Sequence, residues 1–392
     1  MSRLTIIVGI IVCLAVAAGC SKSSSSSTAT STVFSNLSGF TTIPSASGDL
    51  LGGAVQKGPF AAKLDNYSTV SSPAFTFKNL TSQFSGPIDV TTDKTNHFAV
   101  NRLSHGIVKI DPAGLVIPFA GTGSAGFNNI SSPVSARTAL FNSPTAITTD
   151  ATGTVFYVAD SANHAIRKIG AGMVSVLAGT GLAGNEDTNT SLGVRARFNN
   201  PIGVTVVGTK VFVVDSNNHT IRMIDTAVNP VVVTTLAGSP GVSGSADGHI
   251  KDKDARFRQP ARIATDGENL YVTDFGNRTV RRISLKTGEV TTIAGRVGVS
   301  GTTDGVNGSS LFRQPNGIAT DGVNLYVTDF PASVDLANPF EGTIRRIELQ
   351  SGTYKTTTIR TDLRLRTPVG LTTNGAGLFV ADSVANTIVR IK

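Results

Sequence analysis

Three residues that can bind a metal or a ligand occupy one matching place in successive segments of this chain. His164, His219 and Arg278 each lie four residues after an aspartate that ends an apolar run. Histidine nitrogen is a common zinc ligand, and a catalytic zinc is usually held by three protein ligands. The other histidines are expected elsewhere in their segments: His97, His105 and His249. Two histidines leave such a metal site incomplete, so no metal or other cofactor is predicted.

Aspartates and arginines of these segments recur too regularly to be catalytic residues. A residue that every segment needs is expected to make a hydrogen bond or ion pair that builds the segment. The recurring residues are Asp160, Asp215, Asp274, Asp329 and Asp382, with Arg167, Arg222, Arg281 and Arg345. The sequence also lacks a Gly-x-Ser-x-Gly elbow, a phosphate loop and a dinucleotide fingerprint.

A second group of aspartates lies in glycine-rich loops. Its members are Asp187, Asp247, Asp252, Asp254 and Asp304. Asp-Gly pairs are turn signals, and no run here has the spacing of an EF-hand calcium loop. Turns are therefore a stronger interpretation of these residues than calcium binding.

The segments are copies of one unit that recurs six times. Each copy begins at a proline followed by a short apolar strand, and successive prolines are 57, 57, 59, 55 and 53 residues apart. The six prolines are Pro87, Pro144, Pro201, Pro260, Pro315 and Pro368. A fixed period of this length indicates a solenoid, an array or a propeller.

The second copy shows the strands of one unit most clearly. Apolar and β-branched runs cover residues 144–150, 155–159, 165–169 and 173–178, with Gly, Asp and Asn at the turns between them. Four short antiparallel strands per unit are typical of a propeller blade. The sequence therefore predicts an all-β fold, a six-bladed β-propeller with four-stranded antiparallel blades.

The motif of the unit resembles the NHL repeat. It reads Pro-x-Gly-Ile, then Tyr-Val-x-Asp-x-x-Asn-x-x-Ile-Arg-x-Ile, then Ala-Gly, and the resemblance covers roughly residues 87–392. Unit one is a degenerate copy, because Asn101 and Val108 replace its Asp and Arg. The resemblance implies a six-bladed propeller. Some NHL-like propellers, such as the peptidyl-hydroxyglycine amidating lyases, bind zinc through histidines at the central channel, so a metal-dependent hydrolase or lyase is the alternative function.

The last unit ends at Lys392 after its third strand, so it needs a fourth strand from elsewhere. A ring must close or leave sheet edges exposed. Residues 74–80 alternate as a strand does, and we predict that they complete the last blade. Residues 33–86 are interpreted as an N-terminal arm that includes this strand.

The first 32 residues resemble the start of a bacterial lipoprotein. Residues 1–19 combine Arg3, an apolar core and small residues before Cys20, as a signal peptide does. We expect cleavage before Cys20 and acylation of its thiol, followed by a Ser/Thr tether over residues 20–32. An uncleaved anchor is the less favoured interpretation. The predicted location is the cell envelope, with a lipid anchor in the membrane, and Ser21 indicates the outer membrane if the cell is Gram-negative.

Strand alternation divides the loops of the predicted ring between two faces. Turns between the first and second strands and between the third and fourth share one face, here called the turn face. The other turns and the long loops between blades share the opposite face, the loop face. The loop face also carries an insertion of nine residues between Asp329 and Ile344. Long loops on a rigid scaffold are where binding usually occurs.

We expect the loop face to bind a protein, peptide or glycan. The candidate contacts are His164, His219, Arg278, Phe330 and Phe340, with the phenylalanines as exposed aromatic groups beside basic ones. The formal net charge is +8, but the chain has no run of Lys or Arg, and nucleic acid is not an expected partner outside the cytoplasm. The protein is expected to be a monomer and a binding scaffold.

Overall fold

The computed structural model describes most of the repeat region. The described residues are 75–76, 84–128, 132–188, 195–331, 342–350, 352–359 and 365–391. All of them belong to a compact unit that spans Ile43–Lys392. Cys20, Phe340 and the predicted signal and tether lie outside the described residues. Within the described residues, no helix is long and apolar enough to cross a membrane.

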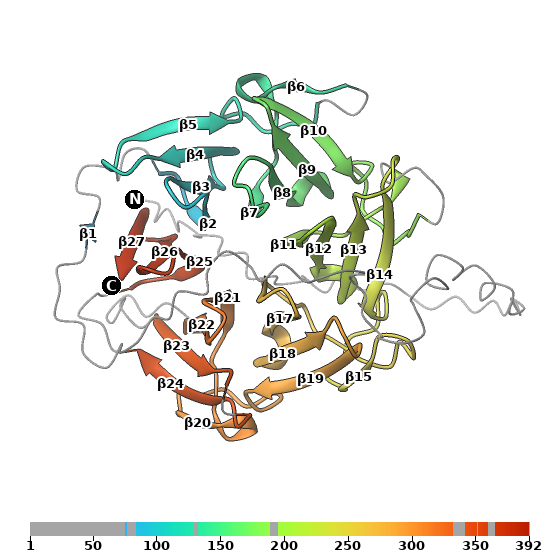
Figure 1. The fold of residues 1–392 in the computed structure, drawn as a ribbon, viewed down its shortest axis with the longest axis vertical. Coiled ribbons are helices and arrows are strands. Elements are labelled where there is room, and N and C mark those ends of the chain that lie inside the picture. Colours follow the sequence, from blue (N-terminus) through green and yellow to red (C-terminus); the bar gives the residue numbers. More distant parts are fainter. Residues whose placement is uncertain are drawn as a thin grey trace, which may run out of the picture. The chain divides into compact units, whose positions relative to one another are not determined.

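Six antiparallel sheets follow one another around a ring, as predicted (Figure 1). The first strands are β2 (Pro87–Thr92), β7 (Pro144–Thr149), β11 (Pro201–Val207), β16 (Ile263–Thr265), β21 (Pro315–Thr320) and β25 (Pro368–Thr373). The second strands are β3 (His97–Asn101), β8 (Phe156–Asp160), β12 (Lys210–Asp215), β17 (Asn269–Asp274), β22 (Asn324–Asp329) and β26 (Leu378–Asp382). These first strands lie nearest the axis of the ring.

The outer strands complete the blades. The third strands are β4 (Gly106–Ile110), β9 (Ala165–Gly170), β13 (Thr220–Asp225), β18 (Thr279–Ser284), β23 (Thr343–Glu348) and β27 (Thr387–Ile391). The fourth strands are β5 (Val116–Ala120), β10 (Met173–Ala178), β14 (Val232–Gly238), β19 (Glu289–Ala294) and β24 (Lys355–Ile359). Short fifth strands pair with β10, β19 and β24: β6 (Val134–Ser135), β15 (Gly248–His249) and β20 (Gly305–Val306). Blades thus hold three to five strands rather than a uniform four.

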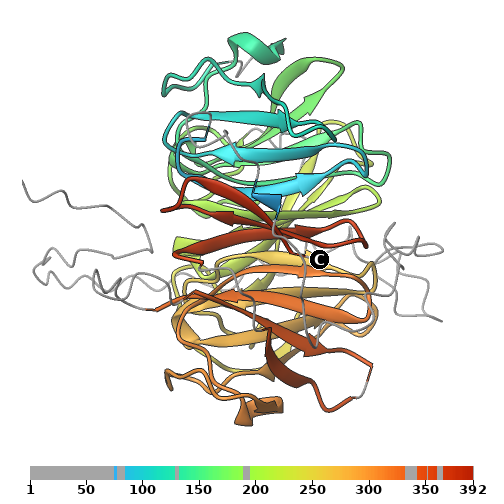
Figure 2. The same ribbon diagram turned by 90° about the vertical axis from the view of Figure 1, so that its left-hand side faces the viewer.

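The side view in Figure 2 shows the blades edge-on. Apolar side chains from the facing sides of adjacent sheets form the core between them, which explains why the strands are apolar on both faces. Hydrogen bonds between loops confirm the predicted loop face. Gly241 N donates to Asn218 O and Gly298 N donates to Asn277 O, so loops between blades contact the turns that follow the second strands.

A buried ion pair recurs in four blades, as the sequence predicts. The distances between guanidinium nitrogen and carboxylate oxygen are 2.6 Å for Arg167–Asp160, 2.8 Å for Arg222–Asp215, 3.0 Å for Arg281–Asp274 and 3.5 Å for Arg345–Asp329. All eight side chains are fully buried. Removing one partner of such a pair leaves an uncompensated buried charge and costs about 3–5 kcal/mol.

Each of these arginines also stacks on a phenylalanine from the loop that enters its blade. The guanidinium carbons lie 5.0, 5.1, 4.9 and 4.9 Å from the ring centroids of Phe141, Phe198, Phe257 and Phe312, respectively. Three loop aspartates bind the same arginines, with nitrogen–oxygen distances of 2.6 Å for Asp187, 2.8 Å for Asp247 and 3.0 Å for Asp304. These three aspartates therefore hold loops to blades through ion pairs, whereas the sequence indicated turns at their positions.

Blades six and one are packed against each other. A shared cluster joins Val90 and Phe84 to Phe379 and Ile388, and the ring of His97 lies 3.7 Å from that of Phe379. Burial lowers the pKa of His97 to about 4, and the charge of Arg390 acts in the same direction. Next to this interface, β1 (Phe75–Thr76) pairs with β27 at the edge of blade six.

Candidate functional sites on the two faces

The predicted ligand-binding residues of the loop face follow the second strands. Short 3-10 turns over Ser161–Asn163, Ser216–Asn218 and Phe275–Asn277 come directly after the buried aspartates. The next residue has left-handed backbone geometry, with φ of 49° at His164, 59° at His219 and 60° at Arg278. All three side chains are half-buried. The structure thus places them at one equivalent position in three blades.

Their side chains bridge to the next blade. In each case the donor is the backbone N–H of the residue just before the proline that begins the following blade. Asn200 N donates to Nδ1 of His164, and Gln259 N donates to Nδ1 of His219, both at 3.1 Å. Arg278 makes a related bridge, because its Nε donates to Arg313 O at 3.1 Å. The three residues therefore contribute to joining the blades, whatever else they bind.

Two residues not predicted to lie at this position make the same bridge. His105 was expected elsewhere in unit one, but it has φ of 47° and its Nδ1 accepts from Ser143 N at 3.0 Å. Asn386 in blade six, with φ of 54°, accepts from Gly86 N at 2.9 Å and so links the last blade to the first. Both residues lie four positions after the residue that ends the second strand, which is Asn101 in blade one and Asp382 in blade six. Because unit one has Asn101 in place of the recurring aspartate, the sequence did not reveal the position of His105.

The bridging histidines do not gather into a metal centre. Within the part of the chain that the structure describes, no three His, Cys, Asp or Glu residues lie close enough to hold an ion. Each bridging histidine instead uses Nδ1 as an acceptor for a backbone amide of the next blade.

The phenylalanine expected to be exposed on the loop face is buried. Phe330 has 4% of its surface exposed, because it follows β22 directly and packs inward. Its predicted partner Phe340 lies outside the described residues. Aliphatic side chains are exposed there instead, at the ends of the loops and turns of this face. They are Leu103, Leu182, Val242, Val297 and Val299.

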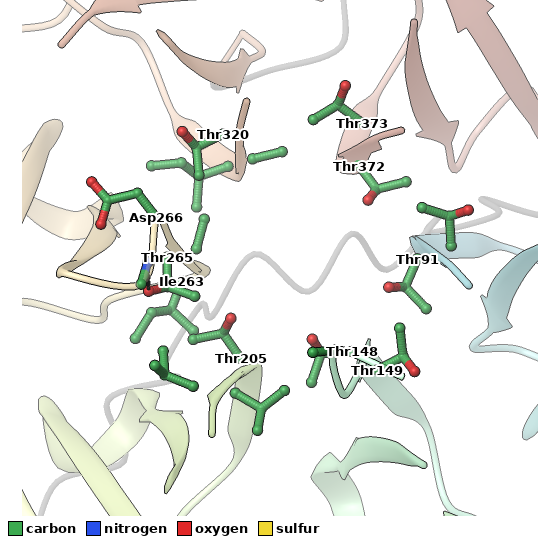
Figure 3. A pocket seen from close by; sticks show the side chains of 18 of the residues that line it. Thr91, Thr148, Thr149, Thr205, Ile263, Thr265, Asp266, Thr320, Thr372 and Thr373 are labelled. Atoms are coloured by element: carbon green, nitrogen blue, oxygen red, sulfur yellow. Dashed lines mark hydrogen bonds between the residues drawn. The ribbon is translucent and has the colours of Figure 1, made fainter. Parts of the chain in front are cut away.

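The turn face opens into a pocket along the axis of the ring, which the sequence analysis missed. This axial pocket has a volume of about 850 Å³ and is lined by the first strands of all six blades and the turns that follow them (Figure 3). Threonines dominate the wall; those that Figure 3 labels are Thr91, Thr148, Thr149, Thr205, Thr265, Thr320, Thr372 and Thr373. The frequency of threonine in the first strands was the available signal.

One arginine spans the inner end of the axial pocket. Arg262 of blade four is 6% exposed. Its Nη1 donates to Ile202 O at 2.6 Å, and its Nη2 donates to Thr145 O at 3.0 Å and to Ile88 O at 3.5 Å. These carbonyls belong to blades three, two and one. A single side chain therefore ties four blades together across the axis.

A buried carboxyl group lies at the same level. Asp89 Oδ2 accepts from Ile147 N of blade two at 3.0 Å. Burial raises the pKa of Asp89 to about 6, although the charge of Arg262 and the backbone hydrogen bonds act against this shift. Asp89 and Arg262 are the charged residues at the second place after the leading proline, where Gly203, Gly317 and Gly370 stand in other blades.

Comparisons with known proteins agree with the motif and the fold. No protein-family model matches the chain. It is 27% identical over 296 residues to Protein SUPPRESSOR OF QUENCHING 1, chloroplastic, of Arabidopsis thaliana, covering 70% of this chain and 27% of that protein. It is 27% identical over 280 residues to human NHL repeat-containing protein 2, covering 62% of this chain and 38% of that protein. The chain thus has NHL-repeat relatives and spans well under half their length.

A solved structure shows the same fold. An auxiliary nutrient binding protein from Bacteroides thetaiotaomicron superposes with a TM-score of 0.53 at 12% identity, covering 79% of this chain and 69% of that one. At such low sequence identity, the superposition establishes the fold alone.

The histidine bridges predict that stability falls in acid. A protonated Nδ1 cannot accept an N–H, and burial lowers the pKa of His164 and of His219, where the charge of Arg258 adds to this effect. Because the folded pKa is depressed, this stability is fully present above the unfolded value of about 6.5 and is lost as pH falls through the folded value. Each lost bond costs about 1 kcal/mol.

The variant H164N/H219N tests this prediction, since Asn386 shows that asparagine can make the bridge. Its melting temperature should match that of the natural protein at pH 7.5 and exceed it at pH 5. Scanning calorimetry at both values measures the difference, in which contributions from other titrating groups cancel. An identical loss of stability in both proteins would contradict the bridging role.

Proposed function

We propose that this protein is a binding propeller of the cell envelope, attached to the membrane by a lipid on Cys20, which engages a protein or peptide with its loop face. The observation that carries the proposal is the set of exposed aliphatic side chains on that face. Leu103, Leu182 and Val242 have exposed fractions of 69%, 60% and 49%. Exposed apolar side chains on the long loops of a rigid scaffold favour an interaction surface there.

The chemistry of these side chains favours a polypeptide over a glycan. Glycan recognition commonly uses exposed aromatic rings, and burial of Phe330 removes one expected ring from the face. Aliphatic groups suit the apolar centre of a protein interface instead. The nutrient-binding description of the Bacteroides protein is in keeping with a binding role for this fold.

Charge substitution on the loop face is expected to weaken partner capture at least tenfold. The variant L182E/V242E/V297E places carboxylates on three loops of that face, whose residues are 60%, 49% and 47% exposed. The matched control, L115E/M173E/V228E, alters residues that are 56%, 40% and 43% exposed beside the turns between third and fourth strands. Quantitative capture of envelope proteins by each tagged variant gives the comparison.

Equal capture by the two variants would contradict a loop-face site. Metal analysis of the same purified protein addresses the alternative of a metal-dependent hydrolase or lyase at the central channel. Stoichiometric zinc that is lost in H164A/H219A would favour that alternative.

The lipid anchor is proposed from the sequence of residues 1–20. Acyl chains on and beside one cysteine give the multiple-chain attachment that stable anchoring needs. Cys20→Ser should therefore move the protein from the membrane fraction to the soluble fraction. Cys13→Ser is the matched control, because Cys13 lies in the apolar core of the proposed signal and its loss should leave the fractionation unchanged. Membrane retention of the Cys20→Ser protein would mean that another route anchors it.

We also propose that the N-terminal arm closes the ring. The pairing of Phe75 with Arg390 and of Thr76 with Val389 supports this. Deleting residues 33–82 should lower the melting temperature and promote aggregation, because it bares the edge of β27. Deleting residues 33–70 keeps the strand and is the control, which should melt like the intact protein. Closure by the arm is wrong if both deletions melt alike and stay monomeric.

A further inference from the structure

We propose that the axial pocket on the turn face binds a primary alkylammonium group, either of a free polyamine or of a lysine side chain in a partner. The proposal concerns the face opposite to the loop face and is independent of it. Three observations carry it: the charge around the mouth, hydroxyl groups in the wall without partners, and the unequal distribution of those hydroxyls.

The mouth of the axial pocket is negatively charged in a protein of net charge +8. Its carboxylates are Asp93, Asp150, Asp266, Glu268 and Asp321, and Lys94 is the basic residue among the lining turns. A cleft lined by charges of one sign raises the local concentration of the opposite ion. The mouth therefore attracts cations and repels phosphates, nucleic acids and anionic glycans.

Turn formation explains why most of these acids are present. Asp93 accepts from the N–H groups of Thr95 and Asn96 at 2.9 and 2.6 Å. Partial burial acts to raise the pKa of Asp93, but these bonds and the charge of Lys109 hold it below its usual value. Asp266 and Asp321 each accept from turn amides and from a tyrosine hydroxyl.

These saturated carboxylates attract an ion but are poor inner ligands for a metal. Ca²⁺ and Mg²⁺ need several oxygen ligands that are free to converge on them. The carboxylates of Asp93, Asp266 and Asp321 instead accept from backbone amides of their own turns, and those of Asp266 and Asp321 also accept from tyrosine hydroxyls of β17 and β22. An organic cation, which needs only acceptors for its N–H groups, fits this mouth better than a bare metal ion.

Acceptors for such N–H groups line the wall deeper in the pocket. Thr91 and Thr205 are each only 8% exposed, and both point into the opening in Figure 3. Among the residues that the structure describes, neither hydroxyl has a hydrogen-bond partner. Neither oxygen is itself buried, so both hydroxyls are accessible from the pocket and can accept an N–H. A ligand with N–H donors would supply the missing bonds.

The hydroxyls form an arc rather than a full ring. Thr148 and Thr372 occupy the equivalent place in blades two and six and also point into the opening, whereas Ala264 and Ala319 occupy it in blades four and five. At this level the opposite wall is therefore apolar. One polar and one apolar side suit an alkyl chain that ends in an ammonium group, because its methylenes can contact the alanines while its N–H groups reach the threonines.

Titration calorimetry on detergent-solubilised full-length protein tests the assignment. The probes are spermidine and the peptide acetyl-Gly-Lys-Gly-amide, with glucose, 1,5-pentanediol and calcium chloride as comparisons. Binding of either cation at one per chain, weakening as salt rises, is expected. Binding of spermidine alone points to a free polyamine, and binding of the peptide alone points to a lysine of a partner; both support the ammonium site.

Two matched variants locate the site. T91V/T205V removes the hydroxyls without partners and should weaken cation binding at least tenfold. T149V/T320V removes hydroxyls that already donate to Val155 O and Asn324 O at 3.1 and 2.8 Å, and should bind nearly as the natural protein does. Thermal melts check that both variants are folded. The proposal is overturned if neither cation binds at millimolar concentration, if glucose or calcium binds in their place, or if both variants bind alike.

Discussion

A carboxylate buried at the end of the second strand organises each of blades two to six. In blade three, Asp215 accepts from Asn199 N at 2.7 Å, from Asn218 Nδ2 at 2.7 Å and from Arg222 Nη1 at 2.8 Å. It thereby holds the incoming loop, the turn after the second strand and the third strand at one point. A buried charge persists only when such partners compensate for its loss of hydration. The asparagine and arginine that recur with this aspartate, Asn218 and Arg222 in blade three, supply those partners.

The position of this carboxylate sets the position of the bridge to the next blade. The 3-10 turn that follows Asp215 places His219 in a left-handed conformation, and the ring Nδ1 of His219 accepts from the amide of Gln259. The same geometry recurs at the seam between blades six and one, where Asn386 takes the role of histidine. The hydrogen bonds that hold a blade together thus also place the residue that joins it to the next blade. The joined blades in turn hold the first strands around the axial pocket.

Sequence reasoning reached the architecture because each blade repeats one pattern of strands, turns and ion-pair residues. It also assigned the recurrent Asp and Arg to structure, since catalysis does not need the same group in every unit. It could not find the bridges, because the acceptor and donor, such as His164 and Asn200, meet only when blades stack. Likewise, threonines are common in strands, and only the closed ring shows that the hydroxyls of Thr91 and Thr205 face the opening.

The informative residues of the axial pocket are those that break the repeat. Glycine suffices at the level where the first strands approach most closely, since a Cβ at Gly370 would lie 2.2 Å from Asp89 Oδ1 and one at Gly317 would lie 2.0 Å from Val369 O. Packing alone would therefore favour small residues all around. Arg262 and Asp89 are the large exceptions at this level. At the level of the threonine arc, Ala264 and Ala319 are the exceptions. Arg262 and Asp89 also bond to neighbouring blades. The alanines make no such bond, so they are the departure through which the pocket could distinguish one ligand from another.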